Sequence, residues 1–281
     1  MGVPPAVVTE TLDRIRDETT GPIAANFILH FVDPAEVAEA VAAAAARARV
    51  VDFFCTDPDP GIVEIVHGHG ALACWQVGSR EEAVAAVAAG CDFVIAQGIE
   101  AGGHVRGTIG LLALLDEVLD AVQVPVLAAG GIGSGRAMAA ALAAGADGVR
   151  VGTRFIASEV AAAAGPYLDA LIAARAQDTV YTEAFSVGWP NAPHRLLRSC
   201  IAAATAFPGE IIGEGADVLT GVRHPVKRFE CQSIDKSYTG EIAAMSLWAG
   251  ESVGRVMRVQ PAAEIVRELA EEAETLLRRW R

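Results

Sequence analysis

The sequence is short of basic residues. Its 22 lysines and arginines are outnumbered by 35 aspartates and glutamates, which gives a formal net charge of −13. Proteins that bind nucleic acids draw much of their affinity from Lys and Arg side chains placed on phosphates, so this balance argues against a nucleic-acid partner. An anionic ligand would have to be held by backbone N–H groups and helix N-termini instead.

Long apolar runs, a leader sequence and paired cysteines are also missing. The longest apolar stretches are alanine-rich, as at Val37–Ala46, and are shorter than a membrane span. Residues Met1–Glu10 have neither the basic region nor the apolar core of a signal peptide. The five cysteines form no C-x-x-C pair, and His67-Gly68-His69 has no third metal ligand nearby. We therefore expect a cytoplasmic protein with free thiols, no membrane span and no metal.

What the sequence does contain is an alternation of short apolar runs with helical stretches. The runs are rich in β-branched and aromatic residues, which is typical of buried parallel strands. Helix start signals lie between them: Asp33–Glu36 gives an N-cap followed by proline, and Ser79–Glu82 forms a capping box. Ser134 begins a further helix, which Gly145 ends. The six predicted strands are Ile23–Leu29, Val50–Cys55, Ala71–Val77, Phe93–Gln97, Val124–Ala129 and Gly148–Val151.

Strands that alternate with helices form parallel βα units, either in a closed barrel or in an open doubly wound sheet. Gly-rich turns follow the carboxyl ends of successive strands, where a barrel carries its active-site loops, so we favour a TIM-type (β/α) barrel. The alternation fades after Phe155. We therefore expect a barrel core in residues 1–160 and a mainly α-helical lid region, packed on the barrel, in residues 161–281.

One loop carries a candidate catalytic residue. Gln97–His104 follows the fourth predicted strand directly and has three glycines, which let the backbone approach a flat ligand closely. A lone loop histidine is more often satisfied by the backbone or caps a helix. At a barrel strand end after Gly102 and Gly103, however, the imidazole of His104 points into the barrel mouth and can take a proton from a carbon acid.

Two further turns are candidates for holding a phosphate group. Ala128–Gly135, which contains Gly130 and Gly131, follows a strand and begins a helix, and Arg150–Thr153 follows the next strand. Phosphate sites of barrels are built from the last two βα loops, where backbone N–H groups hold the anion. The glycine spacing does not fit the G-x-G-x-x-G dinucleotide fingerprint, so a Rossmann interpretation is weak.

These motifs together resemble the nitronate monooxygenase (2-nitropropane dioxygenase) family. The Q-G-x-E-A-G-G-H, A-A-G-G-I and G-T-R-F segments have the order and spacing of that family between Pro22 and Ser158, and Trp248–Gly250 resembles a later W-A-G segment. The resemblance implies a metal-free, FMN-dependent barrel that oxidises alkyl nitronates or nitroalkanes with O₂ to carbonyl compounds and nitrite.

The resemblance also implies roles for individual residues. His104 would be the catalytic base, Gln97 and Gly102 would contact the flavin ring, and the two glycine turns would hold the phosphate. Arg150 departs from the glutamine that is often found at the start of the second turn. The expected FMN-binding residues are Asn26, Gln97, Gly102, Gly103, Gly130, Gly131, Arg150, Val151, Gly152 and Thr153.

Two alternatives stay open. The E-A-G-G-H motif is shared with NAD(P)H-dependent flavin enoyl-ACP reductases, which would bind a nicotinamide over the same flavin. A barrel of this kind could also bind FMN or a phosphorylated metabolite without catalysing either reaction, because a fold does not fix a function.

The strand count predicts a shortened barrel. A complete barrel has eight strands, whereas the sequence offers six, and the first of them carries the asparagine that belongs to the third strand in the family. Too little chain precedes Ile23 for two more βα units. Either the chain start is assigned too late or the two strands are absent. In the second case, exposed strand edges would weaken FMN binding, promote aggregation or require cover from a partner chain such as a second copy.

Overall fold

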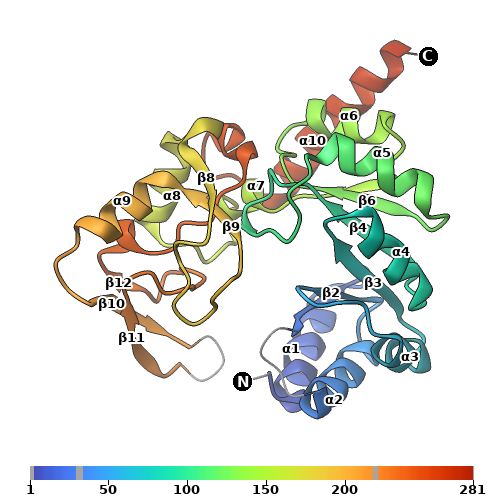
Figure 1. The fold of residues 1–281 in the computed structure, drawn as a ribbon, viewed down its shortest axis with the longest axis horizontal. Coiled ribbons are helices and arrows are strands. Elements are labelled where there is room, and N and C mark those ends of the chain that lie inside the picture. The colour runs from blue at the N-terminus through green and yellow to red at the C-terminus, as the bar shows by residue number, and fades with distance from the viewer. Residues whose placement is uncertain (1–2, 30–33, 218–220, 281) are drawn as a thin grey trace. The chain divides into compact units, whose positions relative to one another are not determined.

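The computed structural model of the protein describes residues 3–29, 34–217 and 221–280 (Figure 1). The chain divides into two compact units. The first consists of Met1–Ala96 and Ala113–Leu127, and the second of Gln97–Leu112 and Ala128–Arg281.

The first unit is built from alternating helices and strands. Neighbouring strands pair in parallel, with Asn26 opposite Asp52 and Phe53 opposite Trp75. The Phe53 and Trp75 rings are buried, with their centroids 4.8 Å apart, so Trp75 is a core residue. The elements are α1 (Pro5–Glu18), β1 (Ala24–Ile28), α2 (Pro34–Ala45), β2 (Val50–Phe54), α3 (Pro60–Gly68), β3 (Leu72–Val77), α4 (Arg80–Ala88), β4 (Phe93–Gln97) and α5 (Leu111–Ala121).

The main sheet has six strands in the order β1-β2-β3-β4-β6-β7, where β6 is Val126–Ala129 and β7 is Gly148–Arg150. Every run that the sequence predicts as a strand is a strand, and among the described residues this sheet has no others. The prediction of six strands is therefore confirmed. Its expected consequences for FMN binding and assembly stay predictions.

The helix boundaries follow the local signals in the sequence. Ser79 Oγ accepts a hydrogen bond from the Glu82 N–H at 3.2 Å, and Glu82 Oε2 accepts one from the Gly78 N–H at 2.7 Å. Gly90, after α4, has a φ of 98°, which favours glycine. Ser134 caps α6 (Gly135–Ala143) through the Ala137 N–H. The predicted N-cap Asp33 lies outside the described residues.

The second unit contains strands that the sequence analysis missed. They form two three-stranded sheets, β5-β9-β8 and β11-β10-β12, in which neighbouring strands pair antiparallel. The region that looked loop-rich is thus partly β-structure. The elements are β5 (Gly103–His104), α7 (Thr153–Ile156), α8 (Gly165–Ala173), β8 (Thr179–Thr182), β9 (His194–Leu197), α9 (Arg198–Ala206), β10 (Ile211–Ala216), β11 (Arg223–Lys227), β12 (Thr239–Gly240) and α10 (Ala262–Leu277).

Helix α10 lies beside α6 within this unit (Figure 1). Its Ile265 and Leu269 are buried, as the amphipathic pattern predicts. A Cβ atom on Gly135 would lie 2.4 Å from the Cβ of Glu272, so glycine is required at the start of α6 for the helices to approach this closely. Among the described residues, no helix combines the length and the apolar character needed to cross a membrane.

Candidate functional site

The loop that ends at His104 is fixed by backbone and side-chain contacts within the second unit. Gly103 and His104 form β5, which pairs antiparallel with β9 so that His104 lies opposite His194. The Gln97 Nε2 donates to the His104 carbonyl at 3.0 Å, and the Arg195 Nε donates to the Ile99 carbonyl at 3.0 Å. The position of His104 is therefore set by β9 as well as by its own glycine loop.

The half-buried imidazole of His104 lies among aromatic rings. The Trp189 ring stacks on it with centroids 3.9 Å apart, and the Trp248 ring lies 5.5 Å away. The His194 ring meets it edge-on at 5.7 Å. The Cys231 Sγ lies 3.6 Å from His104 Nε2. The sequence analysis placed His104 at the site but found none of these neighbours.

His194 has a structural role. It is fully buried, its Nδ1 lies 2.9 Å from the Ala192 carbonyl, and its Nε2 accepts from the Phe185 N–H at 3.3 Å. Because Nε2 accepts, the ring proton is on Nδ1 and donates to Ala192. Burial lowers the pKa of His194 and favours this neutral form. Its two ring nitrogens are thus both used by the backbone, so His194 is a poor candidate for a catalytic base.

Gly102 is required by the packing of the chain itself. A Cβ atom there would lie 2.3 Å from the Gly250 nitrogen, so the two backbone segments meet directly. The Gly250 N–H also donates to Thr153 Oγ1 at 3.0 Å. The Trp248–Gly250 segment therefore closes over the glycine loop, and Gly102 would be needed here even without a ligand.

The two predicted phosphate turns differ in how much room they leave. Gly130 and Gly131 have φ angles of 103° and 68°, in the region that favours glycine. A Cβ atom on Gly130 would lie 2.9 Å from the Gly98 carbonyl oxygen, whereas one on Gly152 would meet nothing within 4 Å. The space beside Gly152 is therefore open. In the same turn Val151 is half-buried and Thr153 is buried.

Gln97 contains a buried polar atom without a partner. The residue is 6% exposed, and its Nε2 is used by His104. Its Oε1 is buried and has no hydrogen-bond partner in the described part of the chain. A buried carbonyl oxygen that accepts no hydrogen bond is costly, so this amide suits a ligand that brings an N–H donor.

Asn26, which is an expected FMN-binding residue, belongs to the first unit, as do His67 and His69. Asn26 is on β1, and its Nδ2 donates to Asp52 Oδ1 at 2.5 Å. His67 lies in α3 with its Nε2 2.9 Å from Asp92 Oδ2, while His69 Nδ1 lies 3.0 Å from the Ile65 carbonyl. No cluster of three or more possible metal ligands occurs in residues 3–29, 34–217 and 221–280.

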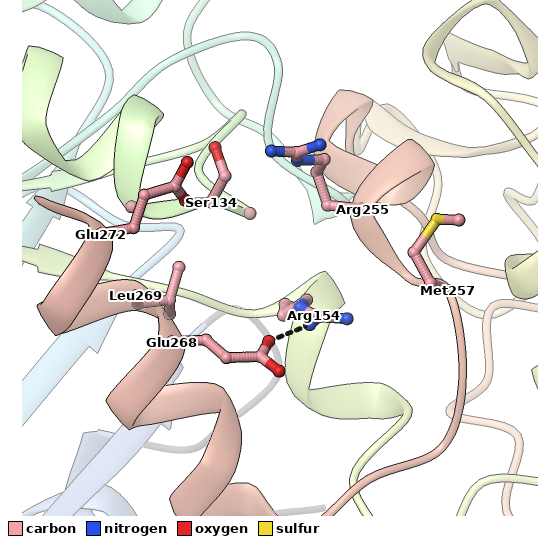
Figure 2. A pocket seen from close by; sticks show the side chains of 9 residues that line it. Ser134, Arg154, Arg255, Met257, Glu268, Leu269 and Glu272 are labelled. Atoms are coloured by element: carbon pink, nitrogen blue, oxygen red, sulfur yellow. Dashed lines mark hydrogen bonds and ion pairs between the residues drawn. The ribbon is translucent and has the colours of Figure 1, made fainter.

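A pocket of about 140 Å³ lies at the N-terminus of α6. Figure 2 shows Glu268 of α10 paired with Arg154 of α7, and Arg255 on another side of the pocket. The Arg154 Nη2 donates to Glu268 Oε2 at 2.8 Å and to Gln260 Oε1 at 2.9 Å. The Gln260 hydrogen bond and the Arg154 charge hold the pKa of Glu268 below its usual range. These contacts tie α10 to α7, the short helix that begins at Thr153.

Comparison with known proteins gives consistent matches. A family model described as "Nitronate monooxygenase" matches residues 8–272. The nitronate monooxygenase of Neurospora crassa is 30% identical over 258 residues, which cover 82% of this chain and 65% of that protein. A curated relative from Mycobacterium tuberculosis is 35% identical over 226 residues, which cover 80% of this chain and 59% of the relative. The chain thus spans about 60% of the length of these relatives.

Solved structures agree with the sequence matches. Nitroalkane oxidase from Streptomyces ansochromogenes is 28% identical with a TM-score of 0.74, over 97% of this chain and 86% of that chain. FabK from Thermotoga maritima is 26% identical with a TM-score of 0.77, over 99% of this chain and 84% of that chain. These likenesses confirm the predicted (β/α)-barrel type of fold.

Proposed function

Because the chain belongs to the nitronate monooxygenase family, we propose that it is an FMN-dependent enzyme that oxidises alkyl nitronates or nitroalkanes with O₂. The products are carbonyl compounds and nitrite. The observation that carries the proposal within the site is the buried, unpartnered Oε1 of Gln97, which shares a loop with the half-buried His104.

The residues present fit a bound FMN. The flavin ring carries an N–H group, which would satisfy Gln97 Oε1. The open space at Gly152 gives a phosphate room to approach the backbone, and we expect backbone N–H groups of the two glycine turns to hold it. Such a site needs no cluster of lysines, which agrees with the acidic composition. Gly103, Gly130, Arg150, Val151 and Thr153 complete the proposed contacts in this unit, and Asn26 is proposed from the first unit.

His104 is the proposed base. A neutral nitroalkane loses its α-proton to the imidazole, and the electron pair of the broken C–H bond stays on the substrate, which becomes the anionic nitronate. Trp189 stacks on the imidazole and Trp248 lies beside it, which limits the access of water to the ring. FMN, when bound, would supply the oxidation of the nitronate, with O₂ as the final electron acceptor. A substrate supplied as preformed nitronate needs no base.

The first test is a product assay with the purified protein loaded with FMN. We expect nitrite to form and O₂ to be consumed when a nitronate is added, without NADH or NADPH. Absence of nitrite from a protein that holds flavin would contradict the proposal.

The enoyl reductase alternative is favoured by the shared E-A-G-G-H motif at Glu100–His104. It predicts oxidation of NADH or NADPH in the presence of an enoyl thioester, and no nitrite from a nitronate. Flavin binding with neither activity would instead favour the catalytically silent barrel.

A further inference from the structure

Cys231 is held in a fixed position beside His104. Its N–H donates to the Val187 carbonyl at 3.0 Å, and the Val187 N–H donates to the Phe229 carbonyl at 3.0 Å. On the other side of Cys231, the Gln232 N–H donates to Ser246 Oγ at 3.1 Å. Because the backbone is tied down on both sides, the fold places Cys231 beside His104, and only rotation about its Cα–Cβ bond moves the sulfur.

The same segment is tied to an aromatic neighbour of His104. The Trp248 Nε1 donates to the Gln232 carbonyl at 2.8 Å, and the Trp248 ring lies 5.5 Å from the His104 ring. Trp189 stacks on one face of the imidazole. The orientation of the imidazole is therefore restricted, and its Nε2 is directed at the Cys231 sulfur, 3.6 Å away.

The protonation of Cys231 determines the direction of this hydrogen bond. Burial, with the negative charge of Glu230 adding to it, raises the pKa of the Cys231 thiol to about 11. The thiol therefore keeps its proton near neutral pH. An S–H group is a weak donor, a thiol sulfur is a weaker acceptor than an imidazole nitrogen, and a neutral imidazole offers one nitrogen lone pair. The favoured arrangement is thus S–H donating to Nε2.

We propose that Cys231 is a positioning residue that holds His104 in one tautomer, with the ring proton on Nδ1 and the basic lone pair on Nε2. The tautomer assignment rests on the contact between Cys231 and His104 and on the protonated thiol, whereas its consequence for catalysis rests on the proposed function. In that reaction the α-proton of the nitroalkane moves to Nε2 and its electron pair stays on the substrate. Cys231 rotates aside with its own proton, and no bond to sulfur forms or breaks.

The tautomer is tested by ¹⁵N NMR of the histidine side chains, which needs no turnover. The chain has six histidines, and a His104→Gln variant identifies the His104 resonances. In the wild-type protein we expect Nε2 to be unprotonated and Nδ1 to be protonated. We expect Cys231→Ala to shift the Nε2 resonance and mix the two tautomers, and Cys231→Ser to preserve the wild-type tautomer because a hydroxyl also donates. A wild-type protein with a proton on Nε2 would overturn the proposal, even if Cys231→Ala does not fold.

Steady-state kinetics test whether Cys231 helps His104 to act as a base. With neutral nitroalkane, we expect kcat of Cys231→Ala to fall about five- to tenfold, which corresponds to roughly one net hydrogen bond. Turnover of preformed nitronate should be unchanged, and Cys231→Ser should recover most of the loss. Cys91→Ala is the matched control, because it removes a buried thiol that lies before β4 and outside this group.

The outcomes separate the proposed role of Cys231 from the proposed nitronate-oxidising function. Equal losses on nitroalkane and nitronate in Cys231→Ala would show that Cys231 supports the structure of the site rather than the base. If the wild-type protein turns over neither substrate, the proposed function fails, while the tautomer assignment is still decided by the NMR spectrum.

Discussion

Two stretches of the second unit contribute to the His104 site in different ways. The first, Gln97–His104, supplies the proposed base and the buried amide oxygen of Gln97. The second, residues 187–250, supplies the Trp189 and Trp248 rings, the thiol of Cys231 and the backbone of Gly250 that closes over Gly102. The comparison teaches that the reacting groups and their surroundings come from different parts of the chain. Loss of His104 in the first stretch should abolish the proton transfer, whereas changes in the second stretch should act through the packing of the site and the orientation of His104.

The largest effect is expected at His104. His104→Asn should lower activity on neutral nitroalkane by about 10²- to 10⁴-fold, the usual contribution of a general base, because asparagine accepts no proton near neutral pH. FMN should stay bound, and much more activity should remain on preformed nitronate. Steady-state rates with the two substrates, measured on protein of known flavin content, check this. An equal loss on both would mean that His104 holds the cofactor or the anion.

The second largest effect is expected at the two predicted phosphate turns. Gly131→Leu should strip the flavin, because leucine rarely adopts a φ of 68° and its Cβ would lie 3.2 Å from that of Glu100. Gly152→Ala is the sharper variant, since its Cβ enters open space at a φ of −109°. It should fold normally yet bind FMN about tenfold more weakly, as expected when one extra methyl group overfills a site. Wild-type FMN affinity in both variants would refute this placement of the phosphate.

Gly102→Ala tests the contact between the two stretches. Its Cβ would lie 2.3 Å from the Gly250 nitrogen, so the backbone must move apart at a cost of about 1–3 kcal/mol in the free energy of unfolding. Thermal melts without FMN check this, with Gly152→Ala as the control that has space for the same methyl group. A Gly102→Ala variant as stable as the control would mean that the two segments are not in tight contact.

Features that depend on a local sequence pattern could be predicted, whereas contacts between distant parts of the chain could not. The six strands, the helix caps at Ser79 and Ser134 and the glycine-rich loop before His104 were all predicted, because each depends on a local pattern. The strand β9 was missed, because two of its four buried residues, His194 and Arg195, are polar and the strand therefore forms no apolar run. Cys231 is 127 residues from His104 in sequence, and no local pattern indicates that the fold brings them together.

The smallest effect is expected at Glu268. Its depressed pKa means that the ionised carboxylate stabilises the folded state above its ordinary pKa, and that this contribution is lost as the pH falls through the folded-state pKa. Glu268→Gln should therefore be less stable than wild type at pH 7, and the difference should shrink as the pH falls below the ordinary glutamate pKa of about 4.3. The effect should stay under about 1 kcal/mol, because the side chain is 48% exposed. Denaturant titrations at the two pH values check this, and a difference that grows on acidification would contradict it.

The central claim is that the Gln97–His104 loop and the two glycine turns hold an FMN that oxidises nitronates. The most direct test is the visible spectrum of the purified protein, recorded without oxygen before and after a nitronate is added. The account predicts a flavin spectrum that bleaches with nitronate alone and returns when air is admitted. A flavin spectrum that nitronate leaves unchanged, but that NADH or NADPH bleaches, would contradict it.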